Sequence, residues 1–98
     1  MTGNGRRVVI GASSVPRFLP HVRFQHDPVR DRWIVLAPER MFVPDDIAAE
    51  ILQRVDGART VATLAGDLAQ DFDAPAATVT LDIITLLQDL ADKMVITA

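Results

Sequence analysis

Few side chains in this sequence have the type and spacing that catalysis or metal binding requires. His21 and His26 are five positions apart, and no cysteine or further histidine completes a zinc-ligand set around them. Ser13 and Ser14 lie in a segment of small and basic residues that offers no scaffold for a Ser–His–Asp triad. We therefore expect a protein that is not an enzyme, with no catalytic residue, no metal and no cofactor.

Three aspartates, Asp67, Asp71 and Asp73, come close together in the chain and could be taken for a calcium site. They lack the loop spacing and the glycine of a calcium-binding loop, so a solvated acidic face is the better interpretation. The chain also has no tyrosine and no glycine-rich phosphate loop. The polar residues therefore indicate a binding function rather than chemistry.

The composition is that of one small globular domain. The 98 residues are 49% hydrophobic and only 5% aromatic, which indicates a core of aliphatic side chains. The absence of cysteine excludes a disulfide scaffold and fits a cytoplasmic protein. No apolar run approaches the roughly 20 residues that span a bilayer, so we expect no membrane partner.

The net charge of −3 conceals an uneven distribution. Residues 1–40 contain seven arginines and three acidic residues, whereas residues 60–92 contain six aspartates and no lysine or arginine. Two interpretations stay open: separate surfaces for separate partners, or two ordinary solvated faces.

The N-terminal part predicts a tail and then a small antiparallel meander. Residues 1–16, rich in Gly, Ser and Arg, are expected to form a flexible N-terminal tail, followed by one domain over residues 17–98. Alternation over 21–27 and the β-branched run at 33–37 predict two strands, and 41–43 predicts a third, very short one.

The hydrophobic period then changes to that of helices. Asp45 or Asp46, Thr60 and Pro75 are suited to begin three successive helices, and Gly57 to end the first. Ile47 and Phe72 fall on the apolar stripes of the first two helices, so both are expected in the core. The helices are predicted over residues 46–55, 61–72 and 76–93, with a short C-terminal strand over 94–98. The predicted fold is α+β and winged-helix-like.

A helix-turn-helix arrangement raises the question of DNA binding, which the third helix argues against. Residues 75–92 contain no lysine or arginine, and they carry Asp82, Asp89 and Asp92, each of which would repel phosphate. We expect no nucleic-acid partner. The remaining interpretation is a module that accepts an extended peptide beside the short third strand, with the third helix as the opposite wall. Packing of a homodimer explains the apolar excess of that helix equally well.

Several segments together resemble a known family. The stretches "PHVRF", "RWIVLAPERMF", "AAEILQRVDGARTV", "LAQDFDAP" and "DIITLLQDLADK" follow one another as in the pyrroloquinoline quinone biosynthesis protein D family, PqqD. The resemblance covers about residues 17–98. It implies a non-catalytic peptide chaperone, of the class of recognition elements for ribosomally made, modified peptides (RiPPs). Such a protein binds the precursor peptide PqqA and presents it to the radical S-adenosylmethionine (SAM) enzyme PqqE, which cross-links a Glu and a Tyr of the precursor.

The resemblance also implies which residues bind the peptide. Carried over to this sequence, they are Arg40, Met41, Phe42 and Val43 on the third strand, and Thr78, Asp82, Ile83, Leu86 and Asp89 on the third helix. Proline at Phe42 is expected to remove a backbone donor from this groove. Arg23, Arg30 and Arg32 are, by elimination, the candidate contact with the enzyme. Two alternatives remain: a recognition element for another peptide-modifying enzyme, and a winged-helix regulator that acts through protein contacts.

This sequence departs from the family pattern at two positions where glycine is frequent. Asp31 stands in the first hairpin, where we expect only a shifted loop because Asp tolerates turns. Met94 follows Lys93 at the end of the third helix, which puts the last strand in question.

Overall fold

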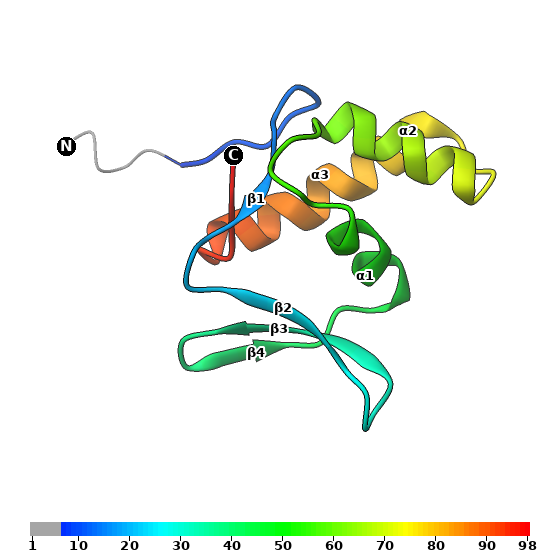
Figure 1. The fold of residues 1–98 in the computed structure, drawn as a ribbon. Helices are drawn as coiled ribbons and strands as arrows, with labels where there is room; N and C mark the ends of the chain where they lie inside the picture. Colours follow the sequence, from blue (N-terminus) through cyan, green and yellow to red (C-terminus); the bar gives the residue numbers. More distant parts are fainter. Residues whose placement is uncertain (1–6) are drawn as a thin grey trace.

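The computed structural model describes residues 7–98 and has a two-layer α+β architecture (Figure 1). A three-stranded antiparallel sheet forms one layer and three helices form the other, as the sequence predicts. The strands and helices are β1 (Arg17–Phe18), β2 (Arg23–Asp27), β3 (Arg32–Ala37), β4 (Arg40–Phe42), α1 (Asp46–Gln53), α2 (Val61–Asp71), α3 (Ala76–Asp92) and β5 (Ile96–Thr97). No described helix is long and apolar enough to cross a membrane.

The sheet is a meander with β3 in the centre, in the order β2-β3-β4. Two residues, Pro38 and Glu39, connect β3 to β4, and Glu39 takes a left-handed conformation with φ 64°. In the preceding hairpin Asp31 has φ 49°, so the aspartate adopts the conformation for which glycine is favoured. Asp27 Oδ1 accepts the Val29 N–H at 3.0 Å and supports that loop.

Side chains cap the first two helices as predicted. Asp45 accepts the Ala48 N–H at 2.8 Å, and Thr60 accepts the Thr63 N–H at 3.1 Å. Each bond satisfies one of the backbone donors that a helix N-terminus leaves free. Pro75 occupies the position before α3, and Gly57 lies in the turn after α1 with φ 76°.

Helix α3 ends at Asp92, and the chain turns back at Met94, which takes the place of a glycine. Its φ is 63°, the Met94 N–H donates to the Ala91 carbonyl at 3.1 Å, and the Val95 N–H donates to the Leu90 carbonyl at 2.9 Å. These two bonds define a Schellman termination. The chain therefore turns back as it would with glycine, and the predicted last strand forms as β5, which pairs with β1.

The core lies between the helices and the inner face of the sheet. Its most deeply buried members come from β3, all three helices and β5, and include Val35, Leu52, Leu64, Leu87 and Ile96. Two residues expected there lie outside: Ile47 is 70% exposed and Phe72 is 57% exposed. Both are at helix ends, Ile47 in the first turn of α1 and Phe72 at the C-cap of α2, where the neighbouring elements no longer cover the stripe.

The N-terminal segment differs from the expected flexible tail over residues 7–16. Ile10 and Pro16 are buried, the Ile10 N–H donates to Gln88 Oε1 at 2.9 Å, and Gln88 Nε2 donates to the Val8 carbonyl at 2.8 Å. The segment has few apolar side chains. Helix α3 supplies a surface for them to pack on, and its Gln88 side chain bonds to the backbone of the segment. Residues 1–6 of the expected tail lie outside the described residues.

Candidate functional site

Strand β4 has an edge without a partner in residues 7–98, since it pairs only with β3. The pairs Ala37↔Arg40 and Val35↔Phe42 are the hydrogen-bonded ones, because Ala37 and Arg40 close a two-residue hairpin. The backbone N–H and C=O of Met41 therefore point away from β3, towards the open edge. This corrects the expectation for proline at Phe42: the donor that faces outward belongs to Met41, and Phe42 is part of the sheet's own ladder.

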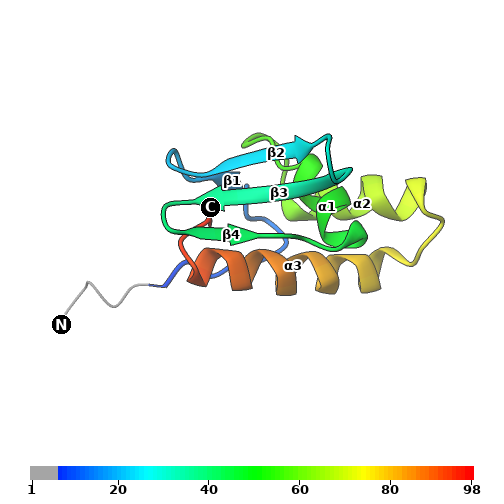
Figure 2. The same ribbon diagram turned by 90° about the horizontal axis from the view of Figure 1, so that it is seen from below.

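Helix α3 runs beside this edge, on the same side of the molecule as β4 (Figure 2). A cavity of about 560 Å³ lies between α3 and the start of α1. Its lining includes Asp45, Ile47 and Ala48 on one side, and Asp82, Thr85, Leu86 and Asp89 on the other. None of its lining residues comes from β4, but β4 approaches the end of α3, where Lys93 Nζ lies 5.7 Å from the centroid of the Phe42 ring. We call this cavity, together with the space between β4 and α3, the β4–α3 groove.

Three of the helix residues implied by the resemblance line this groove, namely Asp82, Leu86 and Asp89. Ile83 does not: its exposed fraction is 0%, because the residue after Asp82 is turned about 100° round the helix into the core. Thr78 is exposed in the first helical turns of α3, outside the cavity lining. On the strand, Arg40, Met41 and Val43 are exposed and Phe42 is half-buried.

Sequence reasoning missed Ile47, Thr85 and Asp45 as groove residues. Thr85 was within reach, since it follows Asp82 by three positions and so lies on the same helical stripe. Ile47 was assigned to the core, because an apolar residue in the first helical turn satisfies the same periodicity whether or not another element covers it. Its exposure depends on where β4 and α3 pass, which the local pattern does not contain.

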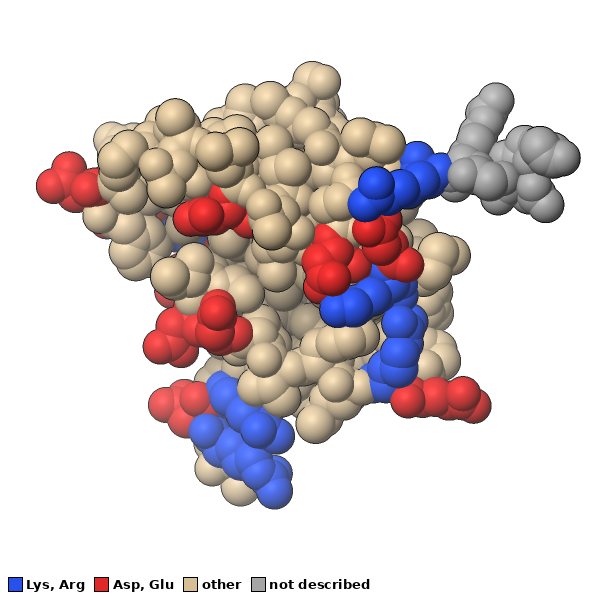
Figure 3. Space-filling view, turned by 180° about the vertical axis from the view of Figure 1, so that it is seen from behind, with Lys and Arg blue, Asp and Glu red and all other residues tan. Residues whose placement is uncertain are grey.

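The two ends of the groove carry opposite charge. At the β4 end, Lys93 Nζ and Arg40 Cζ lie 5.7 Å and 5.6 Å from the centroid of the Phe42 ring. Lys93 also pairs with Asp89 at 2.8 Å. At the α1 end, Asp46 and Asp82 have no ion-pair partner within the described part of the chain. Figure 3 shows this hollowed face, with acidic side chains along it and basic side chains in separate groups.

The three arginines suggested for an enzyme contact are not gathered in one place. Arg30 and Arg32 both approach Asp27 Oδ2, at 3.7 Å and 3.9 Å. Arg23 lies at the opposite end of β2, about 13 Å away along the strand. The β2–β3 hairpin therefore presents two arginines together, and Arg23 forms a separate basic point.

The acidic half of the chain is partly neutralised. Arg59 bonds to Asp67 at 2.9 Å, and Arg54 bonds to Asp71 at 2.9 Å. Hydrogen bonds from the Ala58 and Arg59 backbone N–H groups, and then from the Arg59 side chain, lower the pKa of Asp56. Two of the aspartates in residues 60–92 are thus neutralised by arginines that lie between the basic and the acidic parts of the sequence. Within residues 7–98 no three His, Cys, Asp or Glu side chains are grouped closely enough to hold a metal ion.

The fold and the groove define a small α+β domain with one strand edge held open beside a helix. The chain belongs to the PqqD family: the family described as Coenzyme PQQ synthesis protein D matches residues 32–96. This is a family of non-catalytic binding proteins. A relative from Rhodopseudomonas palustris (strain BisB5), named PqqA binding protein, is 44% identical over 88 residues, which are 90% of this chain and 86% of the relative.

Two solved structures share the fold. The first is the solution NMR structure of the PqqD truncation of Methylobacterium extorquens PqqCD, described as a functional, stand-alone RiPP recognition element. It is 41% identical, covers 93% of this chain and 97% of its own, and has a TM-score of 0.81. The second is a lasso peptide synthetase B1 complexed with the leader peptide, at 18% identity and a TM-score of 0.74, covering 87% of this chain and 100% of its own.

Proposed function

We propose that this protein binds the precursor peptide PqqA in PQQ biosynthesis and presents it to the radical SAM enzyme PqqE. The observation that carries the proposal is the open edge of β4. The Met41 backbone N–H and C=O point away from β3, on the side of the sheet along which α3 runs, and an extended peptide would complete the ladder. Family membership and the relative named PqqA binding protein support this choice of peptide.

The proposed binding mode is addition of PqqA as a further strand beside β4. Backbone hydrogen bonds to Met41 supply affinity, and the apolar and acidic side chains of α3 select the sequence. The lasso peptide synthetase supports an extended peptide as the kind of ligand, because a protein of the same fold is complexed there with a leader peptide.

The enzyme contact in this proposal lies on the other side of the sheet. Arg30 and Arg32 lie at the β2–β3 hairpin and Arg23 lies at the other end of β2, whereas the peptide occupies the β4 edge. Peptide and PqqE therefore bind at the same time, in the cytoplasm, without competition for one surface.

Titration of the isotopically labelled protein with PqqA, followed by NMR, tests the proposal. We expect amide shifts at Met41 and Val43 and along residues 82–89, and subsequent addition of PqqE should shift the hairpin around Arg30. An absence of shifts at near-millimolar PqqA would contradict it. Sedimentation of the same sample identifies a homodimer that closes the β4 edge, and titration with the leader of another modified peptide tests the alternative of a different recognition element.

A further inference from the structure

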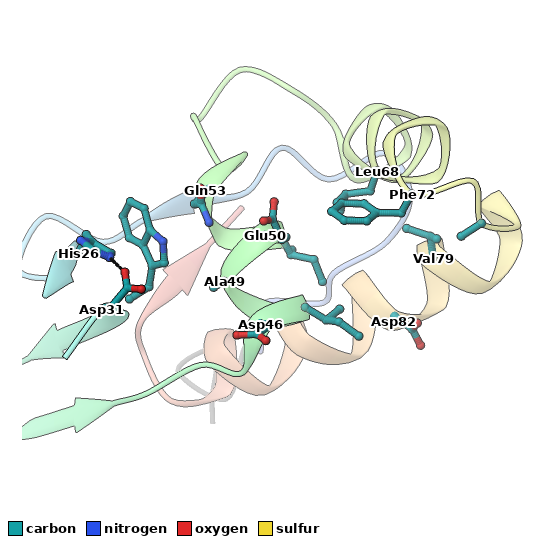
Figure 4. Close-up of a pocket in the computed structure, with 14 residues that line it drawn as sticks. His26, Asp31, Asp46, Ala49, Glu50, Gln53, Leu68, Phe72, Val79 and Asp82 are labelled. Carbon is teal, nitrogen blue, oxygen red and sulfur yellow. Dashed lines mark hydrogen bonds and ion pairs between the residues drawn. The ribbon is translucent and has the colours of Figure 1, made fainter. Parts of the chain in front are cut away.

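A second cavity, of about 590 Å³, extends from the β2–β3 hairpin along α1 to the end of α2 and the start of α3. Among its lining residues, Leu68 and Phe72 come from the end of α2 and Val79 from the start of α3. Figure 4 shows Leu68, Phe72 and Val79 grouped at one end of this cavity, on the opposite side of α1 from His26 and Asp31. We call this end the α2–α3 pocket.

The α2–α3 pocket continues the β4–α3 groove. Ile47, Ile51 and Asp82 line both cavities, so the two cavities adjoin at these residues. Val79 precedes Lys93 by fourteen helical residues, a distance of about 21 Å along α3. An extended peptide rises about 3.3 Å per residue, so about six residues cover that distance. Strand β4, at three residues, pairs with only part of such a peptide.

The apolar wall of the pocket is accessible. Phe72 and Ile47 are large side chains left mostly exposed, although both belong to apolar helical stripes. The only cation against the wall, among the described residues, is Arg54, whose guanidinium carbon is 6.0 Å from the Phe72 centroid. Its charge is balanced by Glu50 and Asp71, at 2.8 Å and 2.9 Å.

Charge indicates what kind of peptide fits along this path. Asp82 lines both cavities and Asp46 lines the second, and a basic side chain at either would be its first ion-pair partner in residues 7–98. Lys93 and Arg40 flank Phe42 at the other end. A peptide with a basic residue at one end and an acidic residue at the other would be complementary to both.

We propose that the α2–α3 pocket receives a bulky apolar side chain of the bound peptide, next to a lysine or arginine that pairs with Asp82. An acidic residue about six positions away meets Lys93 and Arg40. The inference rests on the proposed function, because the ligand is the same PqqA peptide. It adds that the protein also recognises peptide residues beyond those that pair with the three residues of β4.

The test compares two pocket variants with a matched control in binding to PqqA, measured by calorimetry. Phe72→Ala removes an exposed wall of the pocket and should weaken binding about tenfold. Asp82→Asn should weaken binding about threefold and reduce its dependence on salt. Asp73→Asn removes an exposed carboxylate outside both cavities and should leave the affinity unchanged, and amide spectra verify that each variant is folded.

Contacts between the peptide and methyl-labelled protein give an independent readout. We expect nuclear Overhauser effects from an apolar peptide side chain to the Val79 and Leu68 methyl groups. If the wild type binds with shifts at Met41 and Leu86 only, and Phe72→Ala binds equally well, this inference is wrong while the proposed function stands. If the wild type does not bind PqqA at all, both are wrong. Val79 shifts that arise on concentrating the protein alone would assign the pocket to a second copy and also overturn the inference.

Discussion

Lys93, the residue that follows α3, lies over the Phe42 ring of β4, with its Nζ 5.7 Å from the ring centroid. The same ammonium group pairs with Asp89 at 2.8 Å, so it connects the helix wall of the groove to the strand. An exposed cation–π contact of this kind contributes about 0.5–1 kcal/mol. This contact holds together the end of the groove at which Lys93 and Arg40 flank Phe42.

A double-mutant cycle with Phe42→Leu and Lys93→Met isolates this contact. We expect a coupling free energy of about 0.5–1 kcal/mol from urea unfolding, because leucine keeps the apolar contact and loses the ring face. The parallel cycle with Arg40→Met measures the other cation over the same ring. Strictly additive single effects would show that the last turn of α3 is not coupled to β4.

Met94→Gly should stabilise the protein by about 1 kcal/mol. Met94 has φ 63° at the end of α3, a conformation that costs a residue with a Cβ atom more than it costs glycine. Its side chain is 63% exposed, so little packing is lost with it. Thermal unfolding should show a midpoint higher by about 4–8 °C. Met94→Ala is the control and should change little, since alanine keeps the strain; a loss of stability in Met94→Gly would mean that the methionine side chain packs more than its exposure indicates.

Gln88→Ala should release the N-terminal segment from α3. The Gln88 side chain bonds to both the Ile10 N–H and the Val8 carbonyl, so its removal leaves two backbone groups without partners. We expect a loss of about 1–3 kcal/mol in unfolding free energy and faster hydrogen exchange at the Ile10 amide. Gln70→Ala, at an exposed position of α2, is the control. Unchanged exchange at Ile10 would show that burial of apolar side chains alone holds the segment.

Acid destabilisation should depend on the Arg7–Asp92 pair. Bonds of 2.8 Å and 2.7 Å from the Arg7 guanidinium lower the pKa of Asp92 below its ordinary value of 3.8. A carboxyl with a lowered folded-state pKa contributes stability that is present above its unfolded value and is lost as the pH falls through the folded value. In Asp92→Asn the unfolding free energy should therefore fall less steeply as the pH decreases below about pH 4.

The matched variant for this prediction is Arg7→Met, which removes the partner and leaves the carboxyl. It should reduce the loss of stability in acid in the same way, although Gln88 still donates to Asp92 at 3.0 Å. The double variant should add little to either single change. If Asp92→Asn loses as much stability in acid as the wild type, the pH dependence comes from other carboxyl groups. Asp56 is one candidate, because its pKa is also lowered.

Features set by local chemistry could be predicted from the sequence. The caps at Asp45 and Thr60 depend on residues three positions apart, and the meander depends on alternation within single strands. The left-handed residues Asp31 and Met94 show the limit of such reasoning. Neither residue is a glycine, yet each takes the left-handed conformation that glycine favours.

Features set by the packing of distant segments could not be predicted in this way. Ile47 satisfies a core pattern but lies at the junction of two cavities, because no strand or helix covers the first turn of α1. Residues 7–16 have a loop-like composition but gain a partner 78 positions away in Gln88. The family resemblance placed Ile83 in the groove. Its burial can be predicted only once Asp82 is known to face the groove, because the next residue then points into the core.

Met41→Pro should weaken PqqA binding without unfolding the sheet. Met41 is exposed on the edge strand, and its N–H points away from β3, so proline removes a donor from the groove and none from the β3–β4 ladder. One lost backbone hydrogen bond costs about 0.5–1.5 kcal/mol, and the proline ring also obstructs the added strand, so the affinity should fall about tenfold. Met41→Ala keeps the donor and should stay within about threefold of the wild type, since only an exposed side chain is shortened. Phe42→Pro, in contrast, should disturb the amide spectrum of the whole sheet. If folded Met41→Pro binds PqqA as well as Met41→Ala does, the peptide does not pair with β4.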